Sequence, residues 1–145
     1  MNISKVISEL RKDFEARGFK LYFGGEYNSE RDVANKTVII FINDFKPKRE
    51  AGCVYPVNLQ VTVLKSASYL QRLDKQKTGW QTELIDELLE EASDAIDIIN
   101  LRENKVIFIN KKKETINLRY YDSSSNLTVN NEAGIMFEAP AIITM

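Results

Sequence analysis

The chain of 145 residues contains no histidine and a single cysteine, Cys53. Without histidine, the side chain that most often serves as general base and as metal ligand is missing. One cysteine excludes an internal disulfide and a zinc site built from several thiolates. A catalytic cysteine needs a neighbouring base or cation to hold it as the thiolate, and here no histidine can do so. We therefore expect Cys53 to be a packed thiol in a loop, and we predict no catalytic, cofactor-binding or metal-binding residue.

The chain also lacks an excess of charge and any long apolar run. It has 20 basic and 21 acidic residues, whereas a protein that binds duplex DNA usually carries an excess of positive charge. Its longest apolar run, residues 38–42, is far too short to cross a bilayer, and residues 1–18 hold no apolar core of a signal peptide. We expect a protein that contacts no membrane and is assembled in a reducing cytoplasm.

The apolar pattern predicts one α+β domain that spans residues 1–145. A helical stripe with three- and four-residue steps opens the chain and consists of Ile3, Val6, Ile7, Leu10 and Phe14. Residues 80–101 carry a second, longer stripe of the same period, which predicts a long central helix. Residues 66–78 fit either a short helical turn or an ordered loop.

The remaining apolar segments predict a mainly antiparallel sheet packed against these two helices. Residues 19–23 form a short strand, and the continuous apolar run in residues 37–42 predicts a strand covered on both faces. Residues 57–63 alternate between apolar and polar, which is typical of a strand with one wet face. A closing β-meander is expected from residues 106–109, 115–121 and 127–129 and from a last strand within 134–143 that Pro140 interrupts.

Acidic and basic residues are segregated along the chain. The long helix is acidic, and four of its carboxylates recur at helical spacing: Glu83, Glu87, Glu91 and Asp94. Bases gather in a loop at Lys46, Lys48 and Arg49 and at a hairpin tip, Lys111, Lys112 and Lys113. The acidic row is compatible with a solvated face, a docking face for a basic partner, or a metal site. Separate acidic and basic surfaces on a nearly neutral chain favour head-to-tail self-association into a ring, with these ten residues as candidate interface.

Two other classes of function remain open. A hydrolase that uses carboxylates and a divalent ion would bring Glu26, Glu30, Asp32 or Asp44 together with the acids of the long helix. A single-stranded nucleic-acid module would stack bases on aromatic residues beside the lysine tip, with Phe108, Tyr120 and Tyr121 as the candidates. Packing in the core and on the sheet explains the same aromatic residues.

The order of elements resembles that of the small tail-terminator, or tail-completion, proteins of long-tailed phages. The likeness rests on the opening helix, on the strands at 38–42 and 57–63 that flank a basic loop, and on a connection with Tyr69. The acidic helix 83–99 and the closing strands complete it. Other neck, head-completion and tail adaptor proteins of similar size fit nearly as well.

This resemblance implies an assembly role without catalysis. Such proteins form a ring, typically a hexamer, on the end of the completed tail tube. The expected partners are further copies of the chain, the tail-tube protein, and the head connector or stopper protein. DNA would pass through the ring as cargo. The expected location is the tail or neck of the virion, after assembly in the host cytoplasm.

Overall fold

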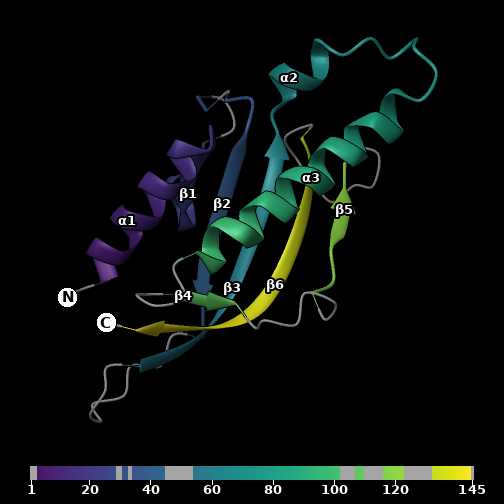
Figure 1. Cartoon of the computed structure of the whole chain (residues 1–145). Helices are drawn as coiled ribbons and strands as arrows, with labels where there is room; N and C mark the ends of the chain where they lie inside the picture. Colours follow the sequence, from purple (N-terminus) through teal and green to yellow (C-terminus); the bar gives the residue numbers. More distant parts are fainter. Residues whose placement is uncertain are drawn as a thin grey trace.

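The computed structural model describes residues 3–28, 31–32, 34–44, 54–101, 107–109, 116–122 and 132–144 (Figure 1). For residues 54, 55, 107–109 and 144 it describes the backbone alone. Its elements are α1 (Ile3–Ala16), β1 (Lys20–Phe23), the 3₁₀ turn η1 (Gly24–Glu26), β2 (Thr37–Asn43), β3 (Val54–Lys65), α2 (Ala67–Gln71), α3 (Trp80–Asn100), β4 (Ile107–Ile109), β5 (Arg119–Tyr121) and β6 (Ala133–Thr144). The α+β class expected from the sequence is confirmed.

The N-terminal helix forms where its apolar stripe predicts it. Val6, Leu10 and Phe14 are buried on one face of α1, against the sheet. Gly18 has a φ of 84°, and the next residue, Phe19, donates its backbone N–H to the carbonyl of Phe14. This left-handed glycine ends the helix and turns the chain into β1.

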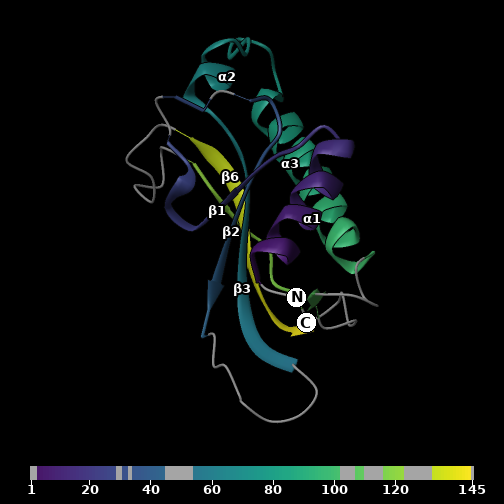
Figure 2. The same cartoon turned by 90° about the vertical axis from the view of Figure 1, so that its left-hand side faces the viewer.

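The long helix α3 covers the sheet on the same side as α1 and crosses it diagonally (Figures 1 and 2). Its inner face buries Leu84, Leu88, Ala95 and Ile99 at helical spacing. No helix in the described part of the chain has an apolar stretch that could span a membrane.

The sheet has the order β1-β2-β3-β6-β4, and β5 also pairs with β6. β1 runs parallel to β2, and the other pairings are antiparallel. In β3, Val57, Leu59, Val61 and Val63 point into the core under the helices, whereas the alternate residues point to the other side, the outer face. The predicted alternation of β3 is therefore confirmed.

The prediction that residues 37–42 are covered on both faces is wrong. Val38 and Ile40 lie in the core, but Ile39 is half-buried and Phe41 is 39% exposed on the outer face. The helices cover only one side of the sheet, so the apolar residues of β2 that point to the other side are partly left in water.

The prediction of a closing β-meander is also wrong, because β4 and β5 each pair with β6 and not with one another. β6 continues through Pro140 as one strand of 12 residues. Pro140 lies between the stretch paired with β5 and the stretch paired with β4, where the described strands leave β6 with a neighbour on one side only. A missing N–H is tolerated at such an edge position. The expected strand at 127–129 lies outside the described residues.

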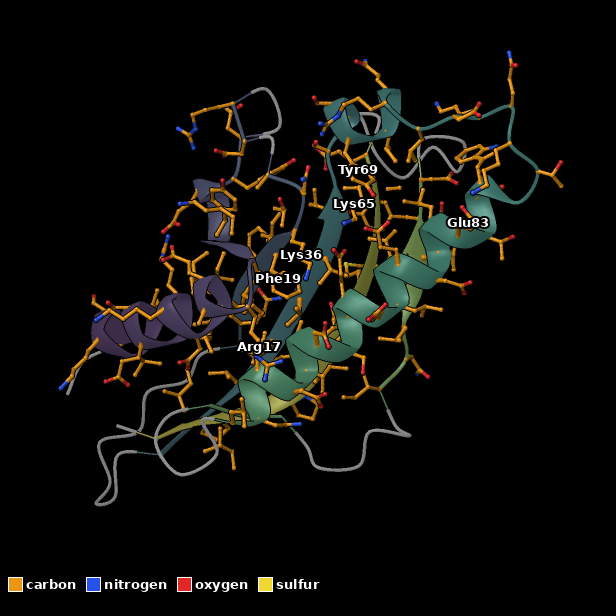
Figure 3. The ribbon with its side chains drawn as sticks, turned by 45° about the horizontal axis from the view of Figure 1, so that its top comes forward. Arg17, Phe19, Lys36, Lys65, Tyr69 and Glu83 are labelled. Carbon is orange, nitrogen blue, oxygen red and sulfur yellow. The ribbon has the colours of Figure 1, made fainter. Side chains whose placement is uncertain are left out.

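The ambiguous segment after β3 contains the short helix α2. The hydroxyl of Ser66 accepts a hydrogen bond from the backbone N–H of Tyr69 at 3.2 Å and caps the helix. α2 thereby carries Tyr69 to the end of β3, beside Lys65, where its hydroxyl reaches Glu87 of α3 (Figure 3).

Candidate functional site

The last residue of β3 places a lysine beneath α3. Lys65 is 1% exposed, and its Nζ lies 2.6 Å from Oε1 of Glu91 and 3.2 Å from Oε1 of Glu87. The same ammonium donates to the carbonyl oxygen of Asn35 at 2.7 Å and lies 4.7 Å from the centre of the Tyr69 ring (Figure 3). Four groups from three regions of the chain thus meet one buried cation.

The structure corrects the choice of Glu91 as a candidate interface residue, because this carboxylate is buried. Its side chain is 4% exposed, and its Oε2 has no hydrogen-bond partner. Burial raises the pKa of Glu91 above its usual value, and the Lys65 ammonium opposes that shift. The sequence does contain the signal, because Glu91 follows Leu84 by seven residues and Leu88 by three and therefore lies on the apolar stripe.

The other acids of α3 differ in exposure. Glu83 is exposed and forms an ion pair with Lys77 at 3.2 Å. Glu87 and Asp94 are half-buried, whereas Asp86 and Glu90 are exposed. The row expected from helical spacing is therefore divided, with one member inside and the others at the surface.

A pocket of about 350 Å³ lies next to Lys65, between α2, the connection that follows it and the first turns of α3. It is lined by Tyr69, Leu73, Asp74, Lys77, Trp80, Glu83, Leu84 and Glu87. The Tyr69 hydroxyl donates to Glu87 at 2.9 Å and so links a residue of α2 to a residue of α3 in the pocket wall. Burial has the larger effect and, together with the hydrogen bond to Glu87, raises the pKa of Tyr69 to about 12.

Cations of the chain itself already lie against the two aromatic rings of this pocket. Lys75 Nζ lies 5.7 Å from the centre of the Trp80 ring, and the Arg72 guanidinium carbon lies 5.9 Å from that of Tyr69. The sequence gives little sign of the pocket, because its walls come from a connection that sequence reasoning left unassigned. Only the pairing of Tyr69 with an acidic helix could have indicated it.

Tyrosines cover the part of the outer face near the start of β6. The Tyr27 hydroxyl donates to Oε1 of buried Glu132 at 3.0 Å, and its ring meets that of Tyr22 edge to face with centres 5.5 Å apart. Tyr121 lies across Gly134, where an added Cβ would come within 2.6 Å of the Tyr121 oxygen. Burial raises the pKa of Glu132, and the hydrogen bond from Tyr27 opposes that shift.

The other part of the outer face carries partly exposed apolar side chains. We call them the outer patch: Ile39, Phe41, Met136, Pro140 and Ile142. Phe41 and Ile142 are 39% and 42% exposed. Polar neighbours separate them, including Asn58, which donates to Glu138 at 3.5 Å. Both helices lie on the opposite side of the sheet (Figure 2).

The predicted basic clusters lie outside the described residues. These are Lys46, Lys48 and Arg49 in the segment 45–53 and Lys111, Lys112 and Lys113 in the segment 110–115. The described chain enters and leaves the first segment at Asp44 and Val54, at the end of β2 and β3 opposite α2 (Figure 1). Cys53 belongs to the same segment.

The carboxylates that a metal-dependent hydrolase would need have separate partners. Glu26 accepts from Arg11 at 3.1 Å, and Asp32 accepts from the backbone N–H of Asn28 at 2.8 Å. Asp44 lies at the far end of β2, and Glu30 lies outside the described residues. Across the described ranges, no three His, Cys, Asp or Glu side chains are grouped so that they could hold a metal ion.

The two tyrosines of the expected base-stacking platform point to opposite sides of the sheet. Tyr120 packs against the core, and its hydroxyl donates to Asp122 at 3.0 Å. Tyr121 lies on the outer face across Gly134. Neighbouring residues of a strand always diverge in this way, so these two cannot share one stacking surface. The side chain of Phe108 lies outside the described part.

Comparison with known proteins adds no relative: no family model matches the sequence, and no curated protein is similar to it. The contacts and surfaces of the chain itself are therefore the basis for a functional proposal.

Proposed function

We propose that this chain is a structural protein of a phage tail, which forms a ring on the end of the tail tube and joins it to the head connector. The proposal starts from the order of elements that resembles tail terminators. It is supported by a fold in which β2 and β3 flank a basic segment, Tyr69 lies on α2, and α3 is acidic.

The observation that carries the proposal is the outer patch. Apolar side chains lie partly in water on the side of the sheet that the helices do not cover, with Phe41 and Ile142 about two-fifths exposed. Exposed apolar groups set among polar neighbours on an uncovered sheet face are suited to contact with another protein. An open sheet face with mixed apolar and polar side chains suits another polypeptide better than it suits a small substrate, which binds in concave sites.

In this proposal the outer patch contacts the last ring of the tail tube, and the helix side faces away from it. Once the patch is covered, the tube no longer presents its own repeating surface, so polymerisation stops. The mechanism is steric and interfacial. A neck or adaptor protein would use the same surfaces, and only its position in the particle would differ.

The test is a capping assay with the tail-tube protein of the same phage. The wild-type chain is expected to halt tube growth and to appear as a ring at one end of each tube in electron micrographs. The double variant Phe41→Ser/Ile142→Ser is expected to lose capping with little loss of stability, because both side chains are already partly in water. The matched control is Leu89→Ser on α3, which removes an apolar side chain that is 40% exposed on the opposite side of the sheet.

Two results would contradict the proposal. Tubes that grow to the same length with and without the wild-type chain would exclude a terminator. Equal loss of capping in the control and in the outer-patch variant would mean that the patch is not the contact surface.

A further inference from the structure

The pocket between α2 and α3 has the chemistry of a site for a positively charged side chain. Asp74, Glu83 and Glu87 line it, and Lys77 is the basic residue among its lining groups. The rings of Tyr69 and Trp80 form part of its wall. Carboxylates bind ammonium and guanidinium groups through charge-assisted hydrogen bonds, and aromatic faces attract the same cations.

Cations of the chain itself show this preference for the two rings. Lys75 lies over Trp80, Arg72 lies over Tyr69, and the buried Lys65 lies over the same tyrosine at 4.7 Å. The pocket volume of about 350 Å³ is at the lower end of the range for ligand pockets, about 300–1,000 Å³. A pocket of this size suits one long side chain.

The complementary charge in this chain belongs to residues 46–49, a segment that the described chain enters and leaves at the end of the sheet opposite α2. Lys48 and Arg49 precede Val54 by six and five residues, and β3 then runs for 12 residues before α2 begins. A 12-residue strand is roughly 35 Å long, whereas six residues of fully extended chain span at most about 21 Å. The stretch of chain that joins these residues to Val54 is therefore too short to span the length of β3, so a second molecule is the source of the basic side chain.

We propose that the pocket of one copy receives a lysine or arginine side chain from residues 46–49 of a second copy. This inference rests on the proposed ring function and identifies one of its subunit contacts. Because donor and acceptor lie at different ends of the molecule, the contact is head-to-tail and leaves both a free pocket and a free basic segment. Such heterologous contacts close into a ring when the rotation from one copy to the next fits.

The test compares charge-reversed variants for self-association by sedimentation over a range of concentrations. Asp74→Lys/Glu83→Lys reverses two exposed carboxylates of the pocket. The matched control, Asp86→Lys/Glu90→Lys, makes the same change in net charge at two exposed positions of α3 that do not line the pocket. We expect the pocket variant to raise the dissociation constant at least tenfold and the control to change it less than threefold.

A charge swap makes the test specific. The variant Lys48→Glu/Arg49→Glu should weaken association as the pocket variant does. A chain that carries all four changes again presents opposite charges at its two ends, so it should recover association. Circular dichroism and thermal melting check that each variant is folded.

The outcomes separate this inference from the proposed function. Equal weakening by the pocket variant and the control, or a folded four-change chain that does not recover, would overturn the pocket contact while tube capping by the wild type stands. Recovery in the swap without capping of tubes would support the contact and remove the terminator function. A wild type that associates neither in solution nor on tube ends overturns both.

Discussion

Replacing Lys65 by methionine keeps the length of the side chain and removes its charge. Because Lys65 is 1% exposed and bonded to Glu91 at 2.6 Å, the change leaves a carboxylate without its main partner in the protein interior. Removing one partner of a buried ion pair costs about 3–5 kcal/mol in the free energy of unfolding. Domains of this size are stable by about 5–15 kcal/mol, so the loss should be large and measurable.

The cost should depend on pH in a defined direction. In Lys65→Met, burial still raises the pKa of Glu91, and the ammonium that opposed the shift is gone. The pKa of Glu91 in the folded state exceeds its unfolded value of 4.5. Protonation of Glu91 therefore stabilises the folded state fully below about pH 4.5, and this stabilisation is lost as the pH rises through the folded pKa. The variant should therefore be most deficient at neutral pH and least deficient below about pH 4.5.

Urea unfolding at pH 4 and pH 7 is the assay, because urea leaves the ionic strength unchanged. The double variant Lys65→Met/Glu91→Leu removes both charges and should recover most of the lost stability. The control Lys77→Met breaks an ion pair whose side chains are 59% and 61% exposed and should cost less than about 1 kcal/mol. If Lys65→Met costs no more than this control, or if the double variant is as unstable as the sum of its single changes, the buried pair is not organised as described.

Three further predictions concern the outer face. Gly134→Ala should destabilise the fold by about 1–3 kcal/mol in thermal unfolding, because the new Cβ would lie 2.6 Å from the Tyr121 oxygen and 2.7 Å from a backbone carbonyl oxygen. The control Gly25→Ala should cost little, because no atom lies within 4 Å of its added Cβ. Tyr27→Phe removes the donor to buried Glu132 and should cost about 1–3 kcal/mol in the free energy of unfolding. The cost should be smaller at pH 4 than at pH 7, because protonation removes the buried charge of Glu132, and an equal cost at both pH values would contradict this. Burial raises the pKa of both Tyr27 and Tyr121 above 10.0, so the folded state should lose stability as pH rises above about 10, and absorbance titration should show these phenols ionising only with unfolding.

Features that depend on neighbours in the sequence could be predicted, and features that depend on distant segments could not. The helices follow from apolar stripes within one window, and Gly18 ends α1 through its own backbone conformation. The alternation of apolar and polar residues in β3 predicts which of its side chains point into the core. By contrast, no local pattern shows that β4 and β5 both pair with β6, or that Pro140 lies at an unpaired edge inside a continuous strand.

The candidate site was predictable to a similar extent. Helical spacing places Glu83, Glu87 and Asp94 at or near the surface, but it treats Glu91 as their equivalent. The partner of Glu91 is Lys65, which lies 26 residues earlier and becomes its neighbour only when β3 and α3 pack together. The sequence can show a charge on an apolar stripe, but it cannot say which opposite charge will meet it.

The position of Glu91 also determines how the assembly hypothesis must be tested. A charge reversal there would disrupt the core and abolish association for reasons unrelated to any interface. By contrast, Asp74 and Glu83 in the pocket and Phe41 and Ile142 in the outer patch are exposed, so they can be changed without removing a core side chain. The pocket and the patch also lie on different sides of the sheet, since α3 covers one side and the patch occupies the other. Variants of the pocket should therefore weaken contacts between copies, and variants of the patch should weaken contact with the tube. If one surface served both contacts, each variant would weaken both self-association and tube capping. The two assays therefore distinguish one shared surface from two separate surfaces.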